Sequence, residues 1–113
     1  MDKQPPPFPL HVTGLGSAAL HAHAEDRMIA ALNQHAPHVE AAEVKFADVN
    51  GPRGGQDKVC HALVRLRHQP PLHVEKAGDD AYALASLVAD CVRQAAGRLL
   101  DKRLEPRRAA QRA

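Results

Sequence analysis

The sequence predicts an α+β fold, a two-layer sandwich in which two helices cover one face of a four-stranded mixed sheet in the order β-α-β-β-β-α. Several segments alternate apolar and polar residues with a period of two, and two longer segments repeat apolar residues at helical spacing. Each predicted strand has only one apolar face, so both helices belong on the same side of the sheet. With 113 residues and 44% hydrophobic content, the chain has room for one domain with its own core.

The first third of the chain predicts a strand followed by a helix. Residues 8–12 form a short extended run, which two glycines at positions 14 and 16 interrupt. Ser17 then stands where its hydroxyl can cap a helix, which is expected to continue to about Gln34 before Pro37 limits it. The predicted buried stripe of this helix is Leu20, Ala24, Met28, Ala31 and Leu32.

The middle of the chain predicts three further strands. In residues 39–50, apolar and polar residues alternate with a period of two, as in a half-buried strand. A Gly-rich loop follows at residues 50–57, and a second strand with the same alternation covers residues 58–67. A turn at residues 68–71 leads into a strand at residues 72–76. The side chains expected to face the core are Val44, Phe46, Cys60, Ala62, Val64, Leu66, Leu72 and Val74. The helix between the first two strands makes that pair parallel, and the short turns make the other pairs antiparallel.

The last helix gives the strongest periodic signal in the sequence. Asp79 is expected to cap it and Pro106 to end it. Its predicted buried stripe is Leu84, Leu87, Val88, Cys91, Val92, Ala95 and Leu99. The chain is therefore expected to comprise a disordered Pro-rich tail at residues 1–7, one α+β domain at residues 8–105, and a basic flexible tail at residues 106–113.

Positive charge is concentrated at the carboxyl end, although the whole chain carries only +2. Residues 93–113 hold seven basic and two acidic residues, a net charge of +5, whereas the first 92 residues hold eight basic and eleven acidic ones, a net charge of −3. This distribution indicates an anionic partner such as RNA or a membrane surface, or else a solvated helix end that aids solubility. Aromatic residues make up 3% of the chain, which argues against a platform for stacked bases.

Other features exclude whole classes of protein. Two cysteines are too few for the disulfide framework of a small secreted protein, no leader is recognisable, and no stretch has the roughly 20 apolar residues of a membrane helix. We therefore expect a cytoplasmic protein. The chain lacks a P-loop, a nucleophile elbow and a complete dinucleotide fingerprint, so neither catalysis nor a small-molecule substrate is expected.

The eight histidines do not form a recognisable metal motif. No set of Cys or His has the spacing of a closed zinc site, so neither a metal nor a cofactor is expected. His61 and His73 should lie on neighbouring strands and face outward, where they could pair at the surface. A solvated sheet face explains these two residues equally well.

Two segments carry recognisable motifs. Residues 44–66 contain an acidic residue, then the run Asn-Gly-x-x-Gly-Gly-x-Asp-Lys, then Cys60. Residues 70–99 place Asp80 before Tyr82 at the start of the last helix. The loop motif consists of Asp48, Asn50, Gly51, Gly54, Gly55, Asp57 and Lys58. With these motifs the sequence resembles the ribosome hibernation promoting factor family, also called the sigma-54 modulation or ribosome-associated inhibitor family.

The resemblance covers about residues 10–103 and implies the fold order given above, which is similar to double-stranded RNA binding domains. It also implies a bacterial regulator of translation that docks on the small ribosomal subunit in stationary phase or stress, covers the channel for messenger and transfer RNA, and holds ribosomes idle. The chain looks like a short form that acts on single ribosomes and is monomeric away from them. The first helix carries a single basic residue, Arg27, where the family usually has more.

The side chains expected to bind ribosomal RNA belong to the last helix, the basic tail, the Gly-rich loop and the strands beside that loop. Lys and Arg there can neutralise phosphates, with an affinity that falls as salt rises. Bare backbone amides of the loop can also approach a phosphate closely. The expected residues are Arg53, Lys58, Lys76, Arg93, Arg98, Lys102, Arg103, Arg107 and Arg108.

An alternative function uses the open face of the sheet instead. Leu63 is expected there among His61, Arg65 and Arg67. An exposed apolar side chain in such a setting could bind a protein partner without any ribosome.

Overall fold

The part of the chain described by the computed structural model comprises residues 6–49 and 58–104, with side chains as far as Leu100. It contains four strands, two α-helices and one 3₁₀ helix, in the predicted order β-α-β-β-β-α. The elements are β1 (Leu10–Thr13), α1 (Ala18–Leu32), η1 (Asn33–His38), β2 (Val39–Asp48), β3 (Lys58–Leu66), β4 (Leu72–Gly78) and α2 (Ala81–Leu104). The expected loop at residues 50–57 and the two expected tails lie outside the described residues, except for Pro6 and Pro7.

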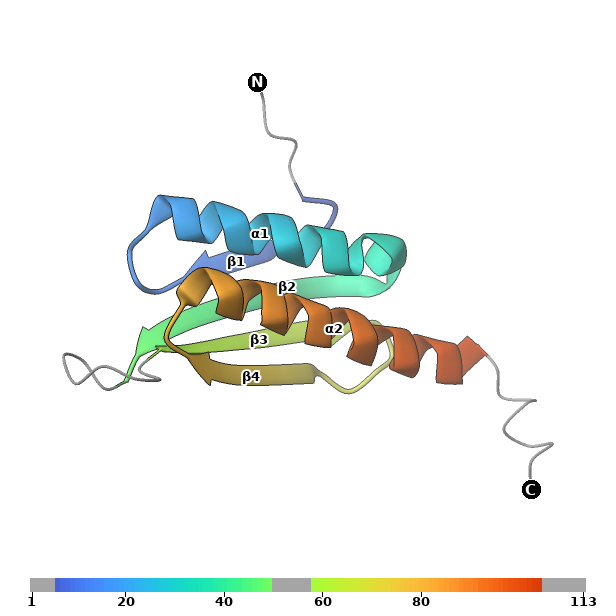
Figure 1. Cartoon of the computed structure of the whole chain (residues 1–113). Helices are drawn as coiled ribbons and strands as arrows, with labels where there is room; N and C mark the ends of the chain where they lie inside the picture. Colours follow the sequence, from blue (N-terminus) through green and yellow to red (C-terminus); the bar gives the residue numbers. More distant parts are fainter. Residues whose placement is uncertain (1–5, 50–57, 105–113) are drawn as a thin grey trace.

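The four strands form one mixed sheet in the order β1-β2-β3-β4. The β1–β2 pair is parallel, and the β2–β3 and β3–β4 pairs are antiparallel. A parallel connection needs a crossover, which α1 supplies, whereas short connections suffice for antiparallel neighbours. Both helices lie side by side on the same face of this sheet, and none of the described helices or strands covers the other face (Figure 1). The predicted fold class is therefore confirmed.

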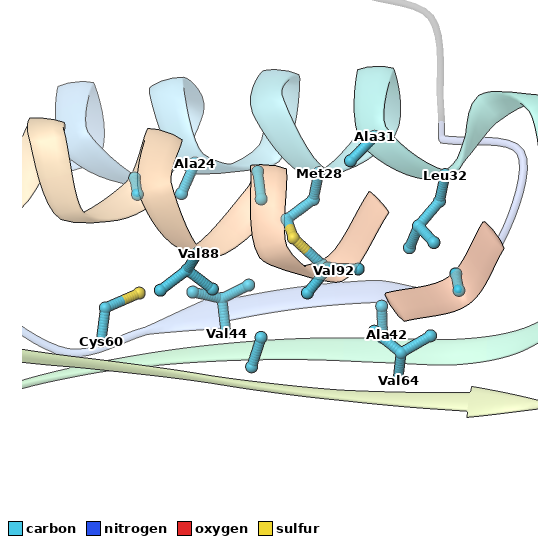
Figure 2. Close-up of a cluster of buried hydrophobic side chains, with 14 of the residues drawn as sticks. Ala24, Met28, Ala31, Leu32, Ala42, Val44, Cys60, Val64, Val88 and Val92 are labelled. Carbon is cyan, nitrogen blue, oxygen red and sulfur yellow. The ribbon is translucent and has the colours of Figure 1, made fainter. Parts of the chain in front are cut away.

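The hydrophobic core lies between the helices and the sheet. Along β3, Cys60, Ala62 and Val64 are completely buried, because alternate residues of a strand point to the same face. Figure 2 shows helix side chains pointing at the sheet across this layer. The five residues predicted for the inward stripe of α1 are all buried, and the inward residues predicted for the strands are buried or packed against the core.

The ends of the first elements differ slightly from the prediction. The strand begins at Leu10 rather than at Phe8, because Phe8 precedes it and inserts into the core with 4% of its surface exposed. The α-helix ends at Leu32, and the chain continues as the 3₁₀ helix η1 with Pro37 inside it. A short 3₁₀ segment commonly forms such a connection, and here it leads directly into β2.

One of the two predicted helix caps is confirmed and the other is wrong. The Oγ atom of Ser17 accepts a hydrogen bond from the backbone N–H of Leu20, at 3.2 Å, as an N-cap does. At the second helix the cap is Asp80, not Asp79. One carboxylate oxygen of Asp80 accepts from the N–H groups of Tyr82 and Ala83, at 2.9 and 3.3 Å. The helix begins one residue later than expected because β4 extends through Gly78.

The predicted stripe of α2 is also partly wrong. Leu84, Val88 and Val92 are buried as expected, but Leu87 is 46% exposed and Cys91 is only half-buried. Ala95 is half-buried too, whereas Leu99 is half-buried but packs against the core as predicted. The helix is rotated so that small residues pack inward in their place, namely Ala85, Ala89 and Ala96, together with Leu100. These alanines permit close contact because α2 packs against α1 as well as against the sheet.

Candidate nucleic-acid interface

The outer surface of the two helices carries the first group of candidate residues. A shallow hollow lies between the helices and is lined by Arg27, Ala30 and Ala31 from α1 and by Asp90 and Arg93 from α2. The small alanine side chains leave room between the helices. Two guanidinium groups and one carboxylate thus meet around a hollow that is open to solvent.

The ion pair in this hollow is weak. A guanidinium nitrogen of Arg27 lies 3.7 Å from a carboxylate oxygen of Asp90, and the two side chains are 44% and 51% exposed. Exposed pairs of this kind contribute about 0–1 kcal/mol and are screened by salt. A phosphate oxygen could therefore replace Asp90 as the partner of Arg27 at small cost.

The two described arginines of α2 point in different directions. Arg93 and Arg98 are both exposed, as the predicted RNA-binding role requires. They are five residues apart, which separates them by about 140° around the helix axis. Arg93 lines the hollow on the side of α1, whereas Arg98 shares its side of α2 with the exposed Leu87. The structure does not bring these two cations into one patch.

The two described lysines form a separate group at one end of the sheet. In the β3–β4 register Lys58 is opposite Gly78 and Cys60 is opposite Lys76, so the lysines are diagonal neighbours on one face. Such neighbours are about 7–8 Å apart. Lys58 is half-buried with Asp48 directly opposite on β2, and Lys76 is exposed. This group lies beside the start of α2, about 18 Å along that helix from Arg93.

The remaining predicted RNA-binding residues lie beyond the described side chains. Arg53, Arg107 and Arg108 fall outside the described residues altogether. Lys102 and Arg103 belong to the last turn of α2, but their side chains are not described. For these five residues the role in binding stays a prediction.

A polar cluster between the helices was not predicted. The Nε2 atom of His23 lies 3.3 Å from the hydroxyl oxygen of Ser86, and the rings of His23 and Tyr82 have centroids 5.2 Å apart. Of the three aromatic residues, Tyr82 is 44% exposed, while Phe8 and Phe46 are buried. The sequence also did not predict that Arg27 contacts residues of α2. Its exposed position on α1 indicated a surface role, but only the packing of the helices shows that its neighbours are Asp90 and Arg93.

The described part of the chain holds few other features that could form a site. No three His, Cys, Asp or Glu side chains there are grouped so that they could hold a metal ion. No helix among those residues is both long enough and apolar enough to cross a bilayer. The two thiols are free.

The thiols should differ sharply in reactivity. Burial raises the pKa of the Cys60 thiol to about 12, whereas Cys91 is half-buried on α2. Because the thiolate is the reactive form, iodoacetamide at about pH 8 should alkylate Cys91 in the folded protein and reach Cys60 only after unfolding. Mass spectrometry of the Cys91→Ser variant tests this, since that variant should stay unmodified until it is denatured. Rapid labelling of the folded variant would contradict the buried position of Cys60.

Comparison with known proteins finds similarity in structure but not in sequence. No family model matches the chain, and no curated protein matches it. A ribosomal subunit interface protein from Coxiella burnetii has a similar structure, with a TM-score of 0.62 at 15% identity, over 84% of this chain and 98% of that one. The N-terminal domain of Protein Y from Thermus thermophilus is also similar, with a TM-score of 0.61 at 18% identity, over 80% of this chain and 93% of that one.

These two similarities concern the fold. At 15% and 18% identity, the chain shares the two-layer arrangement of both structures along nearly their whole length. The shared fold is consistent with the resemblance to the hibernation promoting factor family that the sequence motifs carry.

Proposed function

We propose that this protein is a ribosome-associated factor of the hibernation promoting factor family, which binds the RNA of the small ribosomal subunit in the bacterial cytoplasm and holds ribosomes idle in stationary phase or stress. The observation that carries this proposal is the fold shared with a ribosomal subunit interface protein over almost its full length. The loop and helix motifs of the sequence support the same family. On this proposal the protein acts on single ribosomes, is monomeric away from them, and has no catalytic role.

The proposed contact is with RNA phosphates rather than with bases. The hollow between the helices offers Arg27 and Arg93, whose competing carboxylate is held only weakly. Arginine suits phosphate because its planar group can donate two parallel hydrogen bonds. With Tyr82 as the single exposed residue among Phe, Tyr and Trp, stacking contributes little, and charge supplies the affinity.

The end of α2 supplies the second part of the proposed contact. Figure 1 shows the last turns of this helix projecting past the end of the sheet. Arg98 is exposed in the second half of this helix, and the sequence continues with Lys102 and Arg103. We propose that these three residues reach phosphates that the body of the domain does not touch, and that Lys58 and Lys76 make a further, separate contact.

Co-sedimentation with small ribosomal subunits at increasing salt tests this proposal. The wild-type protein should travel with the subunits at low salt and be released as salt rises, because each phosphate contact releases counterions. The charge-reversal variant Arg98→Glu/Lys102→Glu/Arg103→Glu should no longer co-sediment. The double variant Arg27→Glu/Arg93→Glu should bind more weakly, with a salt dependence reduced by about one unit of log–log slope for each phosphate that is no longer neutralised.

The matched control reverses a charge on the opposite side of the molecule. Lys45 is exposed on β2 and lies on the face of the sheet that no helix covers, so Lys45→Glu should bind like the wild type. Binding that ignores salt would instead favour a protein partner on that open face, near Leu63. If the triple variant still co-sediments normally, the end of α2 is not the contact.

A further inference from the structure

The open face of the sheet carries a pair of histidines that the proposed function does not use. His61 lies on β3 and His73 on β4, and both point away from the helices, since their neighbours Cys60, Ala62 and Leu72 face the core. In the register His61 is opposite Glu75 and Leu63 is opposite His73. The two histidines are therefore diagonal neighbours on one face, a position from which long side chains can meet.

The two imidazole rings meet through specific nitrogen atoms. The Nε2 atom of His61 lies 3.3 Å from the Nδ1 atom of His73, and the ring centroids are 5.4 Å apart with the planes inclined by 35°. An N–H···N hydrogen bond of this kind has a donor ring and an acceptor ring. If the shared proton is removed, both nitrogens present lone pairs to the space between them.

This separation is the one that two ligands of a tetrahedral metal ion require. Imidazole nitrogens bind Zn²⁺ at about 2.0–2.1 Å, so two of them on a tetrahedral ion are about 3.4 Å apart. The separation in the protein thus needs almost no change, and only a rotation of the exposed rings directs both lone pairs at one point. Water can reach that point, because His73 is exposed and His61 is half-buried.

Neighbouring charges act on such an ion in opposite directions. The carboxylate of Glu75 is directly opposite His61 on β4 and attracts a cation, while Lys45 is directly opposite His61 on β2 and repels one. No third ligand completes a group among the described residues, so water must fill the remaining positions. A site of this kind binds reversibly rather than as a structural zinc centre.

We propose that His61 and His73 form a binding site for one divalent transition-metal ion of the Zn²⁺ class, with Nε2 of His61 and Nδ1 of His73 as its protein ligands. Imidazole suits zinc, nickel and copper, and copper binds such sites most tightly. The strand pattern predicted that these histidines lie on neighbouring strands and face outward, and the register confirms it. The sequence spacing by itself does not mark them as metal ligands, because the two residues are on different strands. This inference does not depend on ribosome binding.

Calorimetric titration of the whole protein with Zn²⁺, together with nitrogen NMR of the histidine rings, tests the site. We expect one ion per chain and shifts of the two named ring nitrogens. The variants His61→Gln and His73→Gln should each weaken binding by at least the roughly 10–100-fold that loss of an outer-shell partner costs. The matched control is His11→Gln, because His11 is exposed on the same face but two strands away from His61, and it should bind like the wild type.

Both test variants should fold, since each changes a side chain outside the core, and circular dichroism checks this. Zn²⁺ that binds His61→Gln and His73→Gln as tightly as the wild type overturns the proposal. Zn²⁺ that shifts other histidine rings while these two stay unchanged overturns it too, and leaves the pair as a hydrogen bond alone.

Discussion

Replacing Gly14 with alanine should cost at least about 3 kcal/mol of the free energy of unfolding. Gly14 follows β1 with a φ of +96°, which side chains rarely adopt. A Cβ atom at this position would clash with the backbone oxygen of Phe46 on the neighbouring strand β2. Because that obstacle is backbone in the sheet, it cannot move aside as a flexible side chain would. Urea unfolding of the Gly14→Ala variant measures the loss.

The matched control for this prediction is two residues away. Gly16 also has a positive φ, +58°, but a Cβ atom there would meet nothing within 4 Å. Gly16→Ala should therefore cost only the backbone strain, about 1 kcal/mol. Equal losses in the two variants would show that the close approach to Phe46 does not matter for stability.

Replacing Leu84 with alanine should cost about 3 kcal/mol, the usual size for a buried leucine. Leu84 is 4% exposed in the first turn of α2, where its side chain packs over Gly78 at the end of β4. The truncation leaves a cavity between that helix and the sheet. Denaturant unfolding, with the midpoint compared at an unchanged slope, gives the loss of stability.

Leu87 offers the control in the same helix. It is 46% exposed, so Leu87→Ala should change stability by no more than about 0.5 kcal/mol. The sequence pattern predicted both leucines in the buried stripe, and this pair of variants separates that prediction from the observed rotation of the helix. A large loss in Leu87→Ala would mean that the helix lies as the pattern predicted.

The strands and the first helix could be predicted because their signals are local. Val44 and Phe46 alternate with charged residues, and a strand with one buried face must show that alternation. The stripe of α1 from Leu20 to Leu32 was predicted correctly because all of its large apolar residues except Ile29 occupy one side, and its other sides carry mostly polar residues or alanine. The cap at Ser17 follows from the same local chemistry.

The orientation of α2 could not be predicted in this way. Its sequence has apolar residues over a wide arc, including Leu87 and Cys91 on one side and Ala85 and Ala89 on the other. Hydrophobicity alone favours burying the side of the helix that carries Leu87 and Cys91. Packing beside α1 favours burying the side that carries Ala85 and Ala89, because small residues let two helices approach closely. Packing decides the outcome.

The candidate sites depend even more on long-range packing. Charge counting pointed to the carboxyl end, but it could not place Arg27 beside Asp90 and Arg93 from the other helix. It also grouped Arg93 with Arg98, which the helix turns to different sides. The fold shared with a ribosomal subunit interface protein is consistent with the family that the sequence motifs indicated, although no family model matches the chain.

By itself, the sequence determined the order of strands and helices, the fold class and the face that each strand buries, because each of these follows from the spacing of hydrophobic residues within a single segment. Only the tertiary structure decided how α2 is rotated and which distant side chains become neighbours, such as Arg27 with Asp90 and His23 with Ser86. Those outcomes are set where two elements meet, through the shapes of both surfaces and the register of the strands, and no single segment contains that information.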